Sequence, residues 1–131
     1  MEKTFLLIKP DAVKKNLIGE ILKKTEDAGF KIMDIKMTKF SLAEARKFYQ
    51  VHKGKPFYDK LVKFVSSGRV VAVLLTRKNA VKKLRELVGA TDPKEAKRGT
   101  IRCDLATNVT KNAVHASDSA QSFRFESKFF F

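Results

Sequence analysis

The hydrophobic positions of the chain fall into two kinds of pattern, short continuous runs and helical stripes. Apolar runs at residues 4–8 and 70–75 predict buried strands, and the second run, apolar on both faces, is typical of a central strand. Met33, Ile35 and Met37 alternate with polar residues, which predicts a half-exposed strand. Residues 112–116 form a further short run, where we expect the last strand.

Helical spacing and capping residues predict helices between these strands. Ser41 and Glu44 have the spacing of a capping box, which opens a helix that ends near Tyr49. Asn79 is the expected N-cap of a helix that ends at Gly89. The other expected helices span residues 18–28, a segment that Pro56 opens and Ser67-Gly68 ends, and residues 119–129.

The expected elements follow one another in the order β-α-β-α-α-β-α-loop-β-α. This order contains β-α-β-β-α-β, the ferredoxin-like pattern within the α/β (α+β) class. Residues 90–111 show no sustained period, and long irregular segments in small proteins are usually functional or disordered. No internal repeat or linker indicates a second domain, so we expect a single domain over residues 1–131.

Charge is the unusual global feature of the chain. Lys and Arg total 28 against 14 Asp and Glu, a net charge of +14. This balance favours a polyanionic partner, such as nucleic acid, an anionic membrane or phosphorylated small molecules. The lysines are spread along the whole chain without a basic tail, which favours a solvated surface for most of them. No apolar run approaches the ~20 residues of a membrane span, so we expect no membrane partner.

Cysteine usage and the start of the chain indicate the compartment. Cys103 is the single cysteine, which excludes a disulfide framework and a cysteine zinc site. The residues after Met1 lead directly into the first strand and show no signal-peptide pattern. We therefore expect a reducing, cytoplasmic location.

The chemically most informative stretch spans residues 112–119, where His115 ends an apolar run and small polar residues follow. Asp118 and Gln121 have the spacing of a capping box, so a helix is expected to begin near Ser119. His115 then lies just before a helix N-terminus, where backbone N–H groups favour phosphate. A neutral imidazole is nucleophilic, so His115 is a candidate acceptor of a phosphoryl group. The alternative is a structural histidine with both nitrogens hydrogen-bonded.

Two other polar residues are interpreted from their neighbours. Lys9 follows the first strand and precedes Pro10, and strand ends are usual positions for functional groups in layered α and β folds. The alternative is an ordinary surface lysine. His52 has charged neighbours and no partner at a suggestive spacing, so we expect a surface residue.

Five motifs, in this order and at this spacing, resemble those of the nucleoside diphosphate kinase family over essentially the whole chain. The motifs are residues 4–11, residues 56–58 with 67–72, residues 89–93, residues 99–102 and residues 112–119. The resemblance implies a ferredoxin-like fold with an antiparallel sheet covered by helices, and a homo-oligomer. It also implies two-step exchange of the terminal phosphate between nucleoside tri- and diphosphates through a phosphohistidine.

The resemblance implies a role in phosphoryl transfer for each residue that matches a family motif. His115 is the implied nucleophile, and Glu126 and Ser117 orient its imidazole. The residues implied to contact phosphates or to lie beside the transferred group are Lys9, Tyr49, Arg85, Thr91 and Arg102. These residue types suit the chemistry, because phosphoryl transfer needs cations that stabilise the negative charge on the non-bridging oxygens. The guanidinium group of arginine also matches phosphate geometry.

The remaining implied contacts are to the nucleoside and to a metal ion. Asn112 and Lys9 reach the sugar hydroxyls, while Phe57 stacks on the base with Val109 on its other side. Stacking discriminates little between bases, which suits an enzyme that serves all nucleotides. Magnesium is the implied cofactor, bound mainly by the nucleotide phosphates rather than by protein ligands.

The chain departs from the family pattern at two positions. Family members usually have glycine where this chain has Ala116 and Cys103. Each substitution removes backbone freedom if the φ angle there is positive. The chain also ends soon after Glu126, without the C-terminal contacts of longer relatives, which leaves tetramer and hexamer both open.

A basic nucleic-acid-binding regulator on the same fold is the main alternative function. It would require exposed aromatic residues among basic ones on the sheet, and residues 70–75 show no such pattern. Nucleic-acid binding is therefore expected to be weak and non-specific at most. A histidine phosphatase would require an arginine-histidine-glycine signature beside the nucleophile, which His115 lacks.

Overall fold

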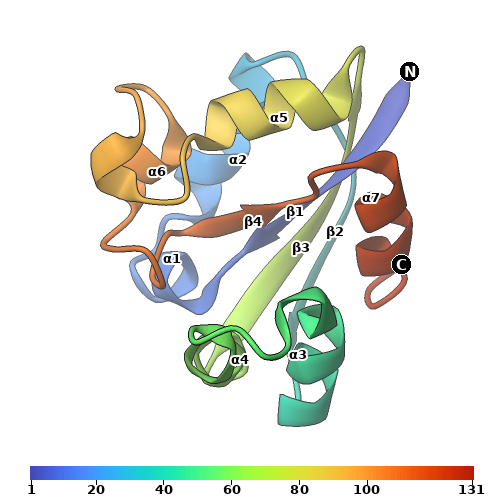
Figure 1. Cartoon of the computed structure of the whole chain (residues 1–131). Helices are drawn as coiled ribbons and strands as arrows, with labels where there is room; N and C mark the ends of the chain where they lie inside the picture. The colour runs from blue at the N-terminus through green and yellow to red at the C-terminus, as the bar shows by residue number, and fades with distance from the viewer.

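The computed structural model describes all 131 residues and contains one four-stranded antiparallel sheet (Figure 1). The strands are β1 (Glu2–Ile8), β2 (Lys31–Lys39), β3 (Arg69–Arg77) and β4 (Val114–Ala116). Their order across the sheet is β2-β3-β1-β4, so β3 is central, as its apolar run predicts. Leu7 of β1 pairs with Ala72 of β3 on one side and with His115 of β4 on the other.

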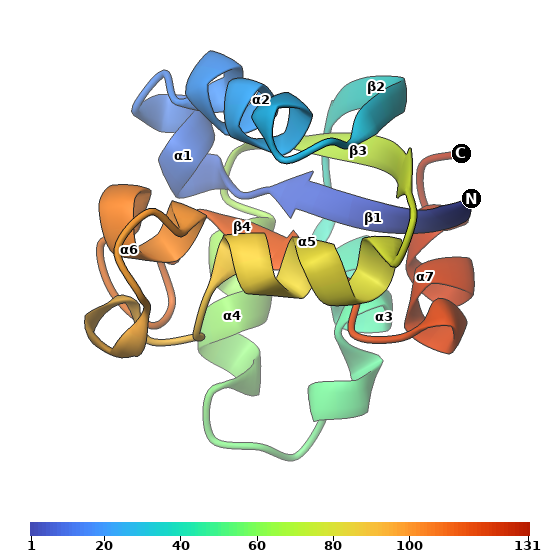
Figure 2. The same ribbon diagram turned by 90° about the horizontal axis from the view of Figure 1, so that it is seen from above.

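Seven α-helices and two 3-10 turns surround the sheet. They are α1 (Pro10–Lys14), α2 (Ile18–Asp27), α3 (Leu42–Phe48), η1 (Gln50–His52), α4 (Tyr58–Val65), α5 (Ala80–Val88), η2 (Pro93–Glu95), α6 (Ile101–Leu105) and α7 (Ala120–Ser127). Helices α2 and α5 cover one face of the sheet, and they lie on either side of β1 in the view from above (Figure 2). Helices α3, α4 and α7 pack against the other face. This arrangement confirms the ferredoxin-like β-α-β-β-α-β order.

Burial on both faces explains the apolar run in β1. Leu6 and Ile8 point into the core beneath α2 and α5, whereas Phe5 and Leu7 point into the core beneath α3, α4 and α7. All four side chains are fully buried. Alternate residues of a strand face opposite sides of the sheet, so a strand covered on both sides has no polar face to expose.

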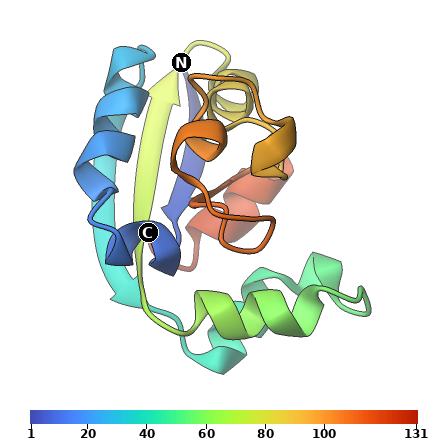
Figure 3. The same ribbon diagram turned by 90° about the vertical axis from the view of Figure 1, so that its left-hand side faces the viewer.

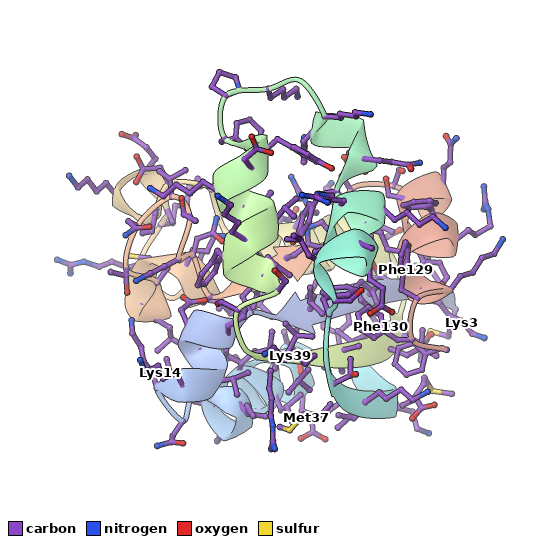
Figure 4. All side chains as sticks on the ribbon, turned by 90° about the horizontal axis from the view of Figure 1, so that it is seen from below. Lys3, Lys14, Met37, Lys39, Phe129 and Phe130 are labelled. Atoms are coloured by element: carbon purple, nitrogen blue, oxygen red, sulfur yellow. The ribbon has the colours of Figure 1, made fainter.

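The aromatic residues at the end of the chain pack on the second core. Phe130 stacks on Phe5 with ring centroids 5.5 Å apart and contacts Phe40 at 5.2 Å, while Phe129 contacts Phe48 at 5.4 Å (Figure 4). Lys36 donates a hydrogen bond from Nζ to the Phe130 carbonyl at 2.9 Å. Phe129 and Phe130 therefore cover the core of their own subunit.

Strand β2 forms an apolar edge of the sheet. It pairs only with β3, and its outer backbone groups have no strand partner. The predicted strand is present, but its apolar face is not buried: every residue except Ile32 is exposed, and Met33, Ile35 and Met37 are 50%, 45% and 48% exposed. Met37 lies at the rim of the molecule in Figure 4. An exposed apolar edge strand favours pairing with another chain.

The predicted helix caps are partly confirmed. Ser41 Oγ accepts from the Glu44 amide at 3.1 Å while Glu44 Oε1 accepts from the Ser41 amide at 2.9 Å, so this capping box is present. Asn79 is the N-cap residue of α5 as predicted, but it has φ +55° and its side chain makes no capping hydrogen bond. Glu2, brought alongside by β1, accepts from the Val81 amide instead, at 2.7 Å.

The cap predicted for the last helix is wrong. Ser119, with extended backbone, is the N-cap and accepts from the Ser122 amide at 3.0 Å. The Asp118 carboxylate accepts from the Ser122 hydroxyl rather than from a backbone amide. The helix therefore begins at Ala120, one residue later than expected, and it ends at Ser127 rather than Phe129.

Residues 90–111 contain two short helical segments that the sequence pattern does not indicate, η2 and α6. Asp92 caps η2 and Thr100 caps α6, each through a side-chain oxygen that accepts a backbone amide. Segments of three and five residues are too short to show a hydrophobic period. Strand β4 is shorter than predicted, because Ala113 has φ +73° and interrupts the extended backbone. No helix of the protein is long and apolar enough to cross a membrane.

Candidate active site

A cavity of about 740 Å³ lies among the α3–α4 hairpin, residues 91–112, and the end of β4 with α7. In Figure 3 the hairpin and residues 90–111 extend to the same side of the sheet. Ten of the eleven predicted site residues line the cavity: Lys9, Tyr49, Phe57, Arg85, Thr91, Arg102, Val109, Asn112, His115 and Glu126. The eleventh, Ser117, lies behind the wall and contacts Glu126.

Strand β4 and helix α7 together hold the His115 imidazole. Nε2 of His115 lies 2.9 Å from Oε2 of Glu126, and Ser117 donates from Oγ to the other carboxylate oxygen, Oε1, at 2.6 Å. The Glu126 carboxylate is thereby fixed between two partners. A carboxylate on one ring nitrogen sets the tautomer and orientation of the ring. With Nε2 as the donor, the lone pair of the neutral ring is on Nδ1.

Two aromatic rings hold the imidazole from the side. Phe48 packs against His115 with ring centroids 5.3 Å apart and 70° between planes, and Tyr49 does so at 5.7 Å and 85°. Both belong to the end of α3, which reaches across to β4. Edge contacts of this kind add packing energy and restrict ring rotation. The nucleophile candidate is therefore held by hydrogen bonding and by packing.

Lys9, at the end of β1, is buried in the cavity wall. Its Nζ donates to Oδ1 of Asn112 at 2.8 Å. Burial and, to a smaller extent, the charge of the nearby Arg102 lower the pKa of Lys9 to about 7, while the charge of Asp11 opposes the shift. The sequence alternative of an ordinary surface lysine is wrong.

Arg102, on α6, is also buried and is held by backbone carbonyls. It donates from Nη2 to Val114 O at 2.9 Å and from Nη1 to Gly89 O at 3.2 Å, and its buried Nε has no partner. Burial lowers its pKa to about 10, and the charge of Arg85 adds to the shift. Arg85, on α5, donates to the Ala116 carbonyl at 3.2 Å.

The three cations of the cavity have no carboxylate partners. The salt bridges of the protein join other residues, and none includes Lys9, Arg85 or Arg102. Positive groups gathered in a partly buried site and free of salt bridges favour the binding of an anion. Arginine forks match phosphate in particular. The lining of the cavity therefore suits a phosphate group, and His115 lies in the same wall.

Neutral polar groups complete this part of the cavity. The Tyr49 hydroxyl is buried without a hydrogen-bond partner, and burial raises the pKa of Tyr49, so the group stays a neutral donor. Asn112 donates from Nδ2 to the Thr91 carbonyl at 3.1 Å, which links the segment before β4 to the segment after α5.

The opposite end of the cavity is apolar and open. Phe57, at the start of α4, is 45% exposed, and Val109 is 53% exposed. Lys55 Nζ lies 5.9 Å from the centre of the Phe57 ring. An exposed aromatic ring at the mouth of a cavity offers a flat surface for stacking.

His52 lies in the cavity wall, so the expected surface position is wrong. Its ring stacks on Tyr49 at 6.2 Å and tilts against Phe57 at 5.2 Å, and its Nδ1 is buried without a partner. Burial lowers the pKa of His52, and Lys55 adds to this shift. The hairpin fold brings these rings together, and no spacing in the sequence signals it. Other lining residues that sequence reasoning missed are Phe48, Gln50, Val51, Leu61, Thr110, Asp118, Gln121, Ser122 and Phe125.

The two departures from the family pattern cause no backbone strain. Outside glycine, positive φ angles occur only at Asn16, Asn79 and Ala113. Ala116 and Cys103 therefore adopt φ angles open to any residue. The strained position beside the cavity is Ala113, and no local sequence pattern indicates it.

The chain matches proteins of one family over its whole length. The family model for nucleoside diphosphate kinase matches residues 2–131. A nucleoside diphosphate kinase from Desulfatibacillum aliphaticivorans is 53% identical over 131 residues, covering 100% of this chain and 95% of that protein.

Solved structures give the same match. The nucleoside diphosphate kinase of Aquifex aeolicus superposes with a TM-score of 0.96 at 43% identity, covering 99% of this chain and 94% of that chain. A halophilic nucleoside diphosphate kinase from Halobacterium salinarum, solved in complex with CDP, gives a TM-score of 0.95 at 37% identity, covering 99% and 87%.

Fold and site together define a nucleotide-dependent phosphotransferase. The chain belongs to the nucleoside diphosphate kinase family. The comparisons do not favour the nucleic-acid-binding alternative.

Proposed function

We propose that this protein transfers the terminal phosphate of a nucleoside triphosphate to a nucleoside diphosphate, through a phosphorylated His115. One observation supports this most directly: three cations without carboxylate partners, Lys9, Arg85 and Arg102, share a cavity with a histidine held by Glu126. Family membership supports the same activity.

In the first step the lone pair on Nδ1 of His115 attacks the γ-phosphorus. The bond from phosphorus to the bridging oxygen breaks, and its electron pair leaves with the nucleoside diphosphate. In the second step a terminal oxygen of another diphosphate attacks the same phosphorus, and the N–P bond breaks. The ring proton stays on Nε2 and is donated in a hydrogen bond to the Glu126 carboxylate. The negative charge of that carboxylate offsets positive charge on the ring.

The cations and neutral donors stabilise charge on the transferred group. Arg102 and Arg85 bind the phosphates through their guanidinium forks, and the Tyr49 hydroxyl and Thr91 add neutral donors. Arg102 is fixed by Val114 O, the residue directly before His115, so cation and nucleophile are positioned by the same strand. Such fixed charges lower the barrier without reorganisation during the reaction.

The rest of the cavity holds the nucleoside. Lys9 and Asn112, joined at 2.8 Å, present ammonium and amide groups to the sugar hydroxyls. Phe57 stacks on the base, and Val109 lies on its other side. Because every base has a π-face, this end accepts purines and pyrimidines alike.

We infer that magnesium is the cofactor and that the nucleotide phosphates supply most of its ligands. No three His, Cys, Asp or Glu side chains gather into a metal site of their own. The cavity does contain the Asp118 carboxylate, whose pKa is held below its usual range by the hydrogen bond from Ser122, so an anionic oxygen is available to a phosphate-bound cation. The ion would supply positive charge to the phosphate oxygens.

We also infer a single domain over residues 1–131, a homo-oligomer and a cytoplasmic location. The exposed apolar edge of β2, with Met33, Ile35 and Met37, supports association of subunits. Whether tetramer or hexamer forms is open. A single free cysteine and a nucleotide substrate support the cytoplasm.

Labelled phosphate tests the proposal. The protein is incubated with magnesium and a nucleoside triphosphate labelled in the γ-phosphate. We expect an acid-labile, base-stable phosphoprotein, and an added unlabelled diphosphate should remove the label as triphosphate. The chain has two histidines, which provide a matched pair: H115A should take no label, and H52Q should still take it. Label on the H115A protein would refute the proposed nucleophile.

A further inference from the structure

The backbone at Ala113 adopts a conformation that L-residues avoid. Its φ is +73°, and the Val114 amide donates to the Asn112 carbonyl at 2.9 Å, which closes a three-residue turn. Turns of this hand are rare and strained for residues with a side chain. The turn lies directly between Asn112, which binds Lys9, and the strand that presents His115.

Residues 9–11 hold both polar backbone groups of Ala113. The Ala113 amide donates to Oδ2 of Asp11 at 3.1 Å, and the Lys9 amide donates to the Ala113 carbonyl at 2.8 Å. Figure 1 shows α1, which contains Asp11, beside the segment that leads into β4. A contact between residues 102 positions apart thus fixes the strained turn.

The charge of Asp11 acts on Lys9 and opposes the lowering of the lysine pKa, but the carboxylate forms no ion pair. It is 7% exposed, it takes part in no salt bridge, and its Oδ1 has no partner. It does not line the cavity. Its one hydrogen bond is the one to the strained amide, which a buried charged acceptor makes strong.

We infer that Asp11 is a positioning residue of the nucleotide site: it holds the turn at Ala113 and so sets the spacing of Asn112 and His115. The inference rests on the proposed function. Without this acceptor the amide of Ala113 loses its partner, and the turn relaxes toward negative φ. The Asn112 side chain then moves away from Lys9, and β4 shifts His115 relative to Glu126.

Single-turnover phosphorylation by a nucleoside triphosphate tests this role in four variants. We expect D11A to phosphorylate His115 about ten- to a hundredfold more slowly, the effect of a small misplacement of reacting groups. D11N keeps an acceptor oxygen and should regain most of the rate. The double variant D11A/A113G should also regain rate, because glycine adopts positive φ without strain.

E2A is the matched control, since Glu2 is a carboxylate that accepts one backbone amide, from Val81, far from the cavity. It should lose thermal stability as D11A does but keep the wild-type rate. If D11A does not fold, D11L, which fills the same space, takes its place in the comparison.

The outcomes separate the inference from the proposed function. Wild-type protein that takes no phosphate contradicts the function itself. Wild-type protein that reacts, with D11A within about threefold of its rate, overturns the positioning role alone. A slow D11A that neither D11N nor the added A113G restores overturns it too, because the turn would then not be the route of the effect.

Discussion

The two ends of the cavity, one proposed to bind the phosphates and the other the base, differ in how firmly their side chains are held; they are called the phosphate end and the base end below. At the phosphate end Arg102 is 5% exposed and bound to two carbonyls, and His115 is fixed by Glu126 and by two aromatic rings. At the base end Phe57 and Val109 are about half exposed and apolar.

This difference matches what each end must do. Phosphoryl transfer requires atoms in line within a fraction of an ångström, so cations and nucleophile gain from being fixed before the nucleotide binds. The base takes no part in the reaction, and a flat ring that binds any base is sufficient. Mutations at the phosphate end should therefore change rate, whereas those at the base end should change affinity.

The largest expected effect is that of H115A. Exchange should fall by at least about ten-thousandfold, because the other imidazole of the cavity, His52, has no carboxylate to orient it and packs on Tyr49 and Phe57 instead. Diphosphate affinity, measured by calorimetry, should stay within about threefold, because the cations and Phe57 still hold the ligand. Wild-type kinetics should be ping-pong, with parallel double-reciprocal lines. Intersecting lines would instead indicate direct transfer between two bound nucleotides.

E126A should lower kcat by about ten- to a hundredfold, the usual cost of losing a partner that orients a histidine. KM for the nucleotide should change little, since Glu126 contacts the ring rather than the ligand. E86A is the control, because Glu86 pairs with Lys83 on the exposed face of α5. A raised KM at unchanged kcat would place Glu126 in nucleotide binding.

F57A should weaken binding of purine and pyrimidine diphosphates by similar amounts, roughly 1–3 kcal/mol of stacking energy per base. The rate at saturating nucleotide should change far less. F57Y keeps the ring and should behave as wild type in titrations with all four bases. Loss confined to one base would show that a polar group reads the base edge, contrary to the comparison drawn above.

The smallest expected effect comes from the pH dependence of binding. The pKa of Lys9 is about 7, so its charge is present below pH 7 and is lost as pH rises through that value. Bound phosphate stabilises the charged form of Lys9, so the pKa of Lys9 is higher in the complex than in the free protein. Diphosphate affinity should therefore weaken by up to about tenfold per pH unit above 7, until the pH reaches the pKa of Lys9 in the complex. K9Q should remove this dependence in calorimetric titrations. An equal pH dependence in K9Q would assign it to another group or to the ligand.

Local pattern was sufficient for most of the fold. The two-sided apolar run at residues 70–75 identified the central strand, and the Ser41–Glu44 spacing identified a cap that is present. Local pattern failed where the hydrogen-bond partner of an element lies far away in the sequence. Glu2 caps α5 across 79 residues, and nothing near Asn79 indicates it. Helix α6, with five residues, was missed because one turn and a half shows no period.

Motif resemblance located ten of the eleven predicted site residues on one cavity wall. It did so because residue types and their order along the chain persist where chemistry requires them. Reasoning from sequence neighbours, by contrast, missed the place of His52 in the cavity wall, because its ring contacts with Tyr49 and Phe57 follow from the bend of the hairpin.

The sequence by itself determined the elements, their order, the family resemblance and the identity of the reacting groups, because these depend on residue type and short-range spacing. Only the tertiary structure decided the state of those groups. Burial lowers the pKa of Lys9, the Glu126 carboxylate meets Nε2 of His115, and Asp11 holds a strained Ala113 from the far end of the chain. Each depends on distances and burial between residues that meet only when the sheet closes, and no local pattern encodes them.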